Sequence, residues 1–206
     1  MEYENSTKKL IREVALKLFN EKTFEKVTLK EICEASGVNK HTFYYYFKSK
    51  DELLKKYYKI PCELTSYDLA TIMTADSYIE QLWIINKNFI DFISDSGVSI
   101  IKQLMIKNIT DHIGTFKHND EQKELFKLQC DIVRKGQKNN EFLNKTDPEV
   151  LVIILKQTLF STIGSWIFKN GEFDYRKAVR FMFEMILDVD EKYREEKDFS
   201  VSSMWE

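Results

Sequence analysis

The chain has 206 residues and a mass of 24.6 kDa, with 43% hydrophobic and 31% charged residues. This length fits one large domain or two small ones, and the composition predicts a soluble, globular protein rather than an extended disordered chain. Only six Gly and two Pro occur, too few for the turns of a β-sandwich, a β-barrel or a glycine-looped nucleotide-binding fold. The composition therefore predicts an all-α fold.

The sequence predicts neither a membrane span nor a secretory leader. Even the apolar run at residues 150–155 is followed by two polar residues, whereas a membrane-spanning helix needs about 20 apolar residues. The N-terminus, MEYENSTKK, lacks the basic-then-apolar order of a signal peptide. Cys33, Cys62 and Cys130 are odd in number and far apart, which favours reduced thiols over a disulfide framework or a metal site. We expect a cytoplasmic protein that has no membrane partner.

The net charge of -2 conceals an asymmetry between two parts of the chain. Residues 1–60 hold 13 Lys and Arg against 9 Asp and Glu, a balance of +4, and residues 61–206 hold the other 18 against 24, a balance of -6. This contrast predicts a small basic head that meets an anionic partner and a larger acidic body that does not.

Two helices are predicted at the start of the chain. Apolar residues at the i, i+3, i+4 spacing indicate a first helix over residues 6–22. Thr28 and Glu31 can form a capping box, in which the hydroxyl accepts one backbone amide and the carboxylate accepts another. The second helix therefore begins here and ends near Ser36.

A tight reversal is predicted at Gly37, because glycine readily adopts the left-handed backbone conformation. Asn39 is a favourable N-cap for a third helix over residues 40–47. A second capping box at residues 49–52 opens a fourth helix, which Pro61 bends or ends.

Five further helices are predicted in the rest of the chain. Apolar periodicity and end signals place them at residues 77–94, 98–112, 120–138, 148–169 and 174–192. With the four preceding helices, the predicted architecture has about nine helices.

The second and third predicted helices are joined by only three or four residues around Gly37. Such spacing is typical of a helix-turn-helix, whose second helix lies in the DNA major groove. The sequence of residues 27–54, VTLKEICEASGVNKHTFYYYFKSKDELL, resembles the DNA-binding head of the TetR family of transcriptional regulators. The resemblance is close over residues 10–54 and is carried by Thr28, Ile32, Ala35, Gly37, Val38, Thr42, Tyr44, Phe47, Lys50 and Leu53. Thr23 is a departure, since the family commonly has Gly after the first helix.

The resemblance implies a helix-turn-helix DNA-binding domain at residues 1–50 and a helical effector-binding and dimerisation domain at residues 51–206. It implies a regulator, expected to be a repressor, that binds a palindromic operator in double-stranded DNA as a homodimer. A small apolar or amphipathic effector would release it. The alternative is a ligand-independent helical DNA-binding adaptor or a protein-interaction module.

Physical reasoning divides the head into buried and exposed side chains. The side chains expected to seal the head against the first helix are Ile32, Val38, Phe43 and Phe47. Exposed side chains of the third helix can reach base edges and phosphates, and the N-termini of the second and fourth helices can seat phosphates. The predicted DNA-binding residues are Thr28, Lys30, Asn39, Lys40, His41, Thr42, Tyr44, Tyr45, Tyr46 and Lys50. The alternative, a buried aromatic helix, conflicts with three successive tyrosines that point in three directions.

A single small head makes few contacts, so two heads spaced ~34–36 Å apart are expected on DNA. The last two helices are the candidates for dimerisation, since apolar residues surround more of residues 148–169 than one core can cover. The predicted interface residues are Leu151, Leu155, Leu159, Ile163, Trp166, Phe181 and Met185. A purely internal core is the alternative.

In the family plan that the resemblance implies, the middle helices enclose an effector cavity with apolar walls and a few polar contacts. The candidate lining residues are Trp83, Asn86, Phe89, Met105, His112, Phe116, Phe126 and Gln129. Ordinary core or surface positions are the alternative for each of them. An effector that prefers a dimer with wrongly spaced heads would lower operator affinity, and the fourth helix would transmit the change.

An enzyme is the first competing class of protein. The chain has three histidines, His41, His112 and His118, and none lies in an HExxH metal motif or a recognised nucleophile motif. No pair of carboxylates stands out among the 33 acidic residues. We therefore predict no catalytic residue, no metal and no cofactor.

Overall fold

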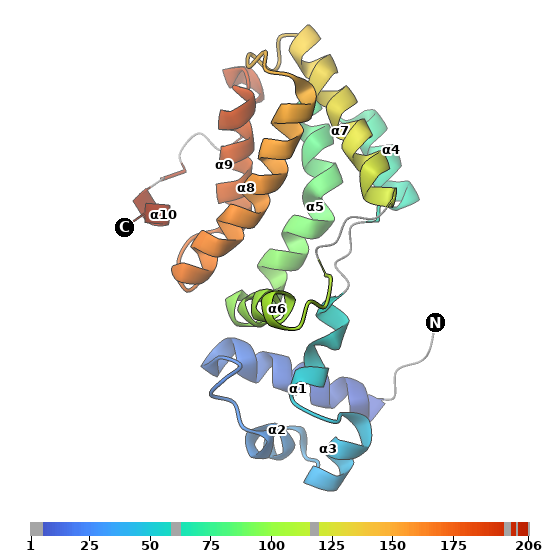
Figure 1. The fold of residues 1–206 in the computed structure, drawn as a ribbon, viewed down its shortest axis with the longest axis vertical. Helices are drawn as coiled ribbons and strands as arrows, with labels where there is room; N and C mark the ends of the chain where they lie inside the picture. Colours follow the sequence, from blue (N-terminus) through green and yellow to red (C-terminus); the bar gives the residue numbers. More distant parts are fainter. Residues whose placement is uncertain (1–5, 59–62, 116–119, 196–198, 201, 206) are drawn as a thin grey trace. The chain divides into compact units, whose positions relative to one another are not determined.

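Helices form nearly all of the regular structure in the described part of the chain (Figure 1). The structure is a computed structural model and describes residues 6–58, 63–115, 120–195, 199–200 and 202–205. Among these residues no strand is present, and an isolated antiparallel bridge joins Phe142 and Val189. The predicted all-α fold is confirmed.

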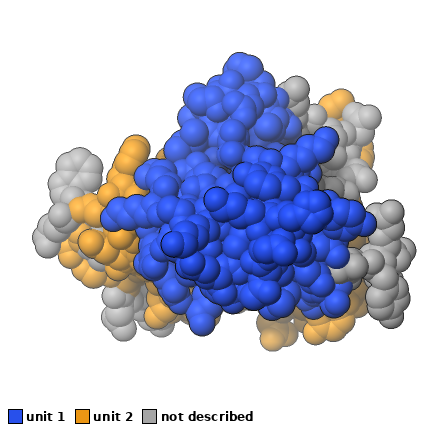
Figure 2. All heavy atoms as spheres, turned by 90° about the horizontal axis from the view of Figure 1, so that it is seen from below, with its two compact units in different colours: residues 1–60, 96–116 blue, residues 61–95, 117–206 orange. Residues whose placement is uncertain are grey.

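The helices divide between two units, which Figure 2 distinguishes by colour. Unit 1 (residues 1–60 and 96–116) contains α1 (Ser6–Lys22), α2 (Leu29–Ser36), α3 (Lys40–Tyr46), the 3-10 helix η1 (Asp51–Tyr58) and α6 (Val98–Thr110). Unit 2 (residues 61–95 and 117–206) contains α4 (Ser66–Thr74), α5 (Tyr78–Ser96), α7 (Asp120–Lys138), α8 (Pro148–Phe168), α9 (Tyr175–Leu187), the 3-10 helix η2 (Glu191–Tyr193) and α10 (Ser202–Trp205). These units do not coincide with the predicted domains 1–50 and 51–206, because η1 and α6 both pack against α1.

Local sequence explains the boundaries of α2 and α3. The predicted capping box is present: the Thr28 hydroxyl accepts the Glu31 amide, and the Glu31 carboxylate accepts the Thr28 amide at 2.8 Å. Gly37 ends α2 with a φ of 67°, in the left-handed region that glycine adopts without strain. Asn39 caps α3 by accepting the Thr42 amide at 2.8 Å.

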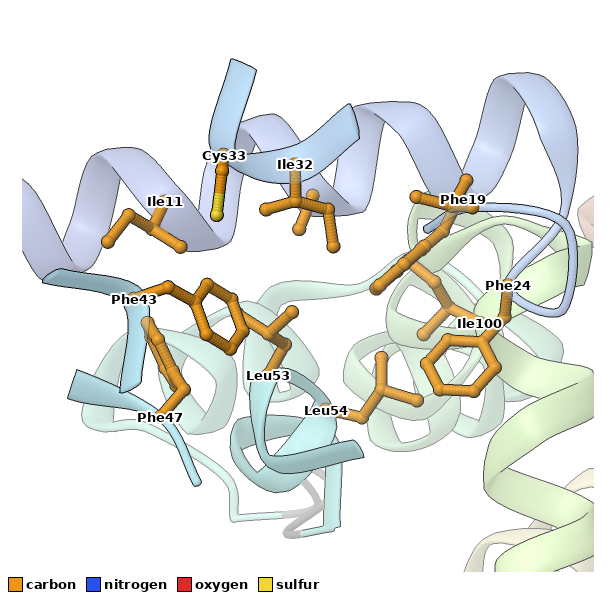
Figure 3. Close-up of a cluster of buried hydrophobic side chains, with 12 residues drawn as sticks. Ile11, Phe19, Phe24, Ile32, Cys33, Phe43, Phe47, Leu53, Leu54 and Ile100 are labelled. Atoms are coloured by element: carbon orange, nitrogen blue, oxygen red, sulfur yellow. The ribbon is translucent and has the colours of Figure 1, made fainter. Parts of the chain in front are cut away.

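A buried apolar cluster joins all the elements of unit 1 (Figure 3). Its members are Ile11, Ala15, Phe19, Phe24, Val27, Ile32, Cys33, Phe43, Phe47, Leu53, Leu54 and Ile100. The rings of Phe43 and Phe47 lie 5.6 Å apart, so two successive turns at the end of α3 are anchored in the core. Val38 is half-buried at its edge. The anchoring fixes which side chains of α3 face outward.

Several elements differ from the sequence-based expectation, and the short helix α10 after the last predicted helix is one of them. The predicted fourth helix is the 3-10 helix η1, and its predicted end at Pro61 lies outside the described residues. The helix α4 is absent from the predicted set, although a capping box between Thr65 and Asp68 marks its start. The last predicted helix is two elements, because Asp188 adopts a left-handed φ of 48° after α9, and η2 follows.

α8 is the most apolar helix of unit 2. Among the described residues, α8 is the one helix that is long and apolar enough to cross a membrane. The sequence-based expectation that the two polar residues after residue 155 exclude a membrane-spanning helix by length and composition is therefore wrong. Its buried residues include Leu151, Val152, Leu155 and Ile163, and it packs against α7 and α9. A helix that is apolar on most of its faces and covered by neighbours is a core helix of a globular unit.

Candidate nucleic-acid interface

α3 has one apolar side in the core and one polar side in solvent. Phe43 and Phe47 are 0% and 1% exposed, whereas Tyr44 and Tyr45 are 55% and 79% exposed. The side chains of residues 40–41, in the first turn, are exposed as well. This division is what a recognition helix requires, since its inner side holds it to the head and its outer side can meet base edges.

The structure places most of the predicted DNA-binding residues on the surface. Those that are exposed are Thr28, Lys30, Asn39, Lys40, His41, Tyr44 and Tyr45, and those that are half-buried are Thr42, Tyr46 and Lys50. The Thr42 hydroxyl donates to Asn39 Oδ1 at 3.1 Å, so both side chains already take part in capping α3. The Tyr45 and Tyr46 rings meet edge to face at 4.9 Å. Whether each of these residues touches DNA stays a prediction.

The N-terminus of α2 already holds a carboxylate of the chain itself. The Lys22 ammonium, which donates at 2.8 Å, and the amide and hydroxyl of Thr28 lower the pKa of Glu31 from 4.5 to about 2. Because the folded pKa lies below the unfolded one, this stabilisation is complete above about pH 4.5 and is lost as the pH falls towards 2. At neutral pH, a phosphate at this helix end would therefore face a fixed negative charge.

Lys50 reaches into the head instead of towards solvent. Its Nζ donates to the Phe24 carbonyl at 2.6 Å and to the Val27 carbonyl at 2.9 Å, and it lies 4.3 Å from the Phe24 ring centroid. Partial burial lowers the pKa of Lys50. The loop that it holds begins at Thr23, whose φ of 73° is in the left-handed region and is strained for a β-branched residue. We assign Lys50, predicted as a phosphate contact, to holding the loop between α1 and α2.

Replacing Lys50 is therefore expected to destabilise the head. Lys50→Met removes two charge-assisted hydrogen bonds and leaves two carbonyls without this donor, for a loss of about 1–3 kcal/mol in the free energy of unfolding. Urea unfolding followed by circular dichroism measures it. The matched control is Lys48→Met, two residues away and exposed, which should change stability by less than about 0.5 kcal/mol. Equal effects of the two variants would contradict the assignment.

The first two turns of α6 hold the same loop from a second direction. The Ser99 Oγ accepts the Phe24 amide at 2.9 Å, and the Gln103 side chain donates to Glu25 at 2.5 Å. Directly before α6, Gly97 has a φ of 83°, in the left-handed region that favours glycine, and it lies against the Asn20 side chain. A displacement of α6 would therefore move the loop that leads into α2.

The predicted effector-pocket residues are spread over both units. In unit 1, Met105 is half-buried and His112 is exposed. Those in unit 2 lie on α5 and α7 and are Trp83, Asn86, Phe89, Phe126 and Gln129. Phe116 lies outside the described residues. Because His112 is exposed, its side chain does not face the interior of its unit. That the remaining candidate residues line an effector pocket stays a prediction.

Most of the predicted dimer-interface residues are core residues of unit 2 itself. The exposed fraction is 6% or less for Leu151, Leu155, Leu159, Ile163 and Trp166. They pack inside the protomer and are not free to meet a partner, because apolar periodicity does not separate the core side of a helix from a partner side. Phe181 is half-buried and Met185 is 48% exposed. The apolar side chains that α8 itself exposes are Val150, Ile153, Ile154 and Phe168.

These features define a helical protein with a helix-turn-helix in its N-terminal unit. Residues 11–57 match the family described as bacterial regulatory proteins, tetR family, and residues 65–189 match the C-terminal region of YsiA-like proteins. The chain belongs to the TetR family. Proteins of this family are DNA-binding transcription regulators with a ligand-binding C-terminal domain, and they are not enzymes.

Solved structures of other regulators share the fold. The fatty acid degradation regulator FadR from Bacillus halodurans aligns with a TM-score of 0.54 at 18% identity, over 90% of this chain and 97% of that chain. The ketosteroid transcriptional regulator KstR2 of Mycobacterium tuberculosis aligns with a TM-score of 0.52 at 16% identity, over 91% and 97%. A TetR-like transcriptional regulator from Rhodococcus sp. RHA1 aligns with a TM-score of 0.52 at 17% identity, over 87% of this chain and 93% of that chain. No curated protein sequence matches the chain.

Proposed function

We propose that the protein is a cytoplasmic repressor that binds a palindromic operator in double-stranded DNA as a homodimer and leaves it when a small apolar or amphipathic effector binds. The observation that carries the proposal is the construction of α3. Two buried phenylalanines and the Asn39 cap hold the helix, and Tyr44 and Tyr45 stand in solvent. A rigid, polar-faced helix of this kind is suited to reading a major groove.

The outer side of α8 and α9 supports a homodimer. Val150, Ile153, Ile154 and Met185 are 41–50% exposed and Phe168 is 87% exposed, although all are large apolar side chains. They lie on two helices that pack against each other. Apolar side chains gathered on one surface are the usual mark of an interface, and a two-fold partner would present the same surface. We therefore propose these residues, together with Phe181, as the dimer interface in place of the buried ones.

Two observations support release by an effector. Structures with the same fold belong to regulators named for fatty acid degradation and for ketosteroids, which favours an apolar or amphipathic molecule. Within unit 1, Ser99 and Gln103 of α6 hold the loop that leads into α2. An effector that binds better to a state with α6 displaced would therefore lower operator affinity by its difference in affinity for the two states.

The proposal is tested by selecting bound duplexes from a random pool at a stated salt concentration. A palindrome with half-sites about one helical turn apart should be enriched, and sedimentation should give a dimer. Tyr44→Ala should weaken binding by about 1–3 kcal/mol per head, the range for loss of a base contact. The matched control is Tyr67→Ala on α4, since Tyr67 is 78% exposed and lies in unit 2. Failure to enrich any palindrome would contradict the proposal.

A ligand-independent DNA-binding adaptor is the alternative, and operator binding separates it from a sensor. Long-chain fatty acids and steroid ketones are the probes, chosen for their apolar and amphipathic character. A sensor should lose operator affinity with a member of such a panel. An adaptor should retain the same affinity with every member.

A further inference from the structure

The chain reverses direction after α9, and hydrogen bonds fix the reversal. Asp188 ends α9 with a left-handed φ of 48°, and the Asp190 carboxylate accepts the Lys192 amide at 3.2 Å as the N-cap of η2. The Arg194 guanidinium then donates to the Val189 carbonyl at 2.5 Å and to the Asp188 carboxylate at 3.2 Å. Arg194 therefore ties the returning chain to the end of the helix that the chain has just left.

The returning chain is next bound to buried groups of α9. The Glu195 amide donates to a Glu184 carboxylate oxygen at 2.9 Å, and a Glu195 carboxylate oxygen lies 3.7 Å from the Arg180 Nη1. Glu184 and Arg180 are 1% and 2% exposed, so packing holds both of these partners in place. Because its partners lie one and two turns before the end of α9, the chain runs back along this helix.

Phe199 continues the same course along α9. Its ring centroid lies 5.4 Å from that of Phe181, and the two ring planes are tilted by 37°. Phe181 and Met185 are four residues apart and share one face of α9. Both belong to the surface proposed above as the dimer interface, so the returning chain reaches that surface. We call residues 199–200 and 202–205 the C-terminal segment.

The C-terminal segment lacks charge and carries large apolar side chains. Residues 199–205 read FSVSSMW, without a charged residue, in a chain that is 31% charged. Phe199 and Met204 are only half-buried in the protomer. The helix α10, which lies outside the packed helices of unit 2 in Figure 1, has four residues, whereas a helix needs about 12–15 to be stable alone in water. These features indicate a segment that needs further cover.

We propose that the C-terminal segment is part of the dimer interface and that the partner subunit covers it. This inference rests on the proposed homodimer. A second copy of the chain fits this place, because a two-fold partner presents its own apolar surface of α8 and α9 to the same surface. Interface cores are depleted in charged residues and enriched in aromatic residues and methionine, which matches the segment. The bonds to Glu184 and Arg180 hold the segment in position beforehand, which reduces the entropy lost on association.

Sedimentation equilibrium over a range of protein concentrations tests the proposal with Phe199→Ala and with a chain that ends at Asp198. Both changes should raise the dimer dissociation constant about tenfold or more, because aromatic side chains dominate interface energetics and the two-fold axis repeats each change. Phe199→Leu keeps an apolar side chain and should have a smaller effect. The matched control is Tyr67→Ala, since Tyr67 is 78% exposed but lies on α4, outside the proposed interface. It should keep the wild-type constant.

The outcomes distinguish this inference from the proposed function. If the wild-type protein is a monomer at every concentration, the proposed homodimer fails and the inference fails with it. If the wild-type protein is a dimer and its dissociation constant is unchanged in the variants, only the inference is overturned, because the segment then packs within its own protomer. Tighter dimers of the variants would show that the segment competes with the partner subunit, and would also overturn it. If circular dichroism shows that the shortened chain has lost helix, the two Phe199 variants decide the question.

Discussion

Arg180→Met is expected to lower the free energy of unfolding by about 3–5 kcal/mol, the range for removing one partner of a buried ion pair. Arg180 is 2% exposed and Glu184 is 1% exposed, and the Arg180 Nε donates to Glu184 at 2.6 Å. Removing the guanidinium leaves a buried carboxylate without its cation. Urea unfolding followed by circular dichroism measures the loss.

The network around Arg180 joins several elements of unit 2. Its Nη2 donates to Glu80 on α5, and its guanidinium carbon lies 5.4 Å from the Trp83 ring centroid. A carboxylate oxygen of Glu195, which follows η2, lies 3.7 Å from the Arg180 Nη1. The backbone amide of Glu195 also donates a hydrogen bond to the Glu184 carboxylate at 2.9 Å. The side chain thus ties α5, α9 and the segment that follows, which is why a large effect is expected.

A double variant and a control separate charge from packing. Arg180→Met with Glu184→Leu should recover most of the lost stability, because apolar replacement of both partners is often neutral. No recovery would show that uncompensated charge is not the cause. The control is Arg176→Ala on the same helix: Arg176 pairs with Asp91 and Asp95 but is 37% exposed. It should cost about 1 kcal/mol or less.

Gly136→Ala is expected to destabilise the protein by about 1–3 kcal/mol, although alanine is normally the better helix former. Gly136 lies inside α7, and a Cβ there would come within 2.3 Å of the Phe142 ring. Phe142 is 0% exposed, so its ring cannot move aside. Thermal or urea unfolding at fixed protein concentration gives the sign and the size of the change.

Gly164→Ala is the matched control, since it also lies within a helix, α8, but its Cβ would meet nothing within 4 Å. Here the usual preference for alanine should hold and stability should rise by roughly 0.5–1 kcal/mol. Adding Phe142→Leu to Gly136→Ala should restore part of the loss. If Gly136→Ala and Gly164→Ala changed the free energy of unfolding in the same direction, the steric explanation would be refuted.

The close approach at Gly136 matters because the segment after α7 joins other helices. The Glu141 carboxylate accepts the Tyr78 and Ile79 amides at 3.0 and 2.6 Å and so caps α5. Burial raises the pKa of Glu141. The Leu143 amide donates to the Asp188 carbonyl at 2.9 Å, which ties the segment to the end of α9. A displaced Phe142 would disturb both connections.

Elements specified by neighbouring residues could be predicted from the sequence. The capping box at Thr28, the glycine turn and the Asn39 cap define the helix-turn-helix, because each motif satisfies backbone groups within a few residues. The aromatic residues at 43 and 47 share one helix face for the same local reason. The helical class and the candidate recognition residues therefore followed from the sequence.

Tertiary structure alone decided which side chains meet across long separations in the chain. Lys50 reads as an exposed cation, yet it bonds carbonyls 26 and 23 residues away. Arg180 and Glu80 are 100 residues apart, and α6 packs against α1. In α8, the sequence determined only that the helix is apolar on most faces. The periodicity of the sequence shows that a face of a helix is apolar. Which element covers that face depends on how helices distant in the sequence pack, and on which charged groups become buried away from water.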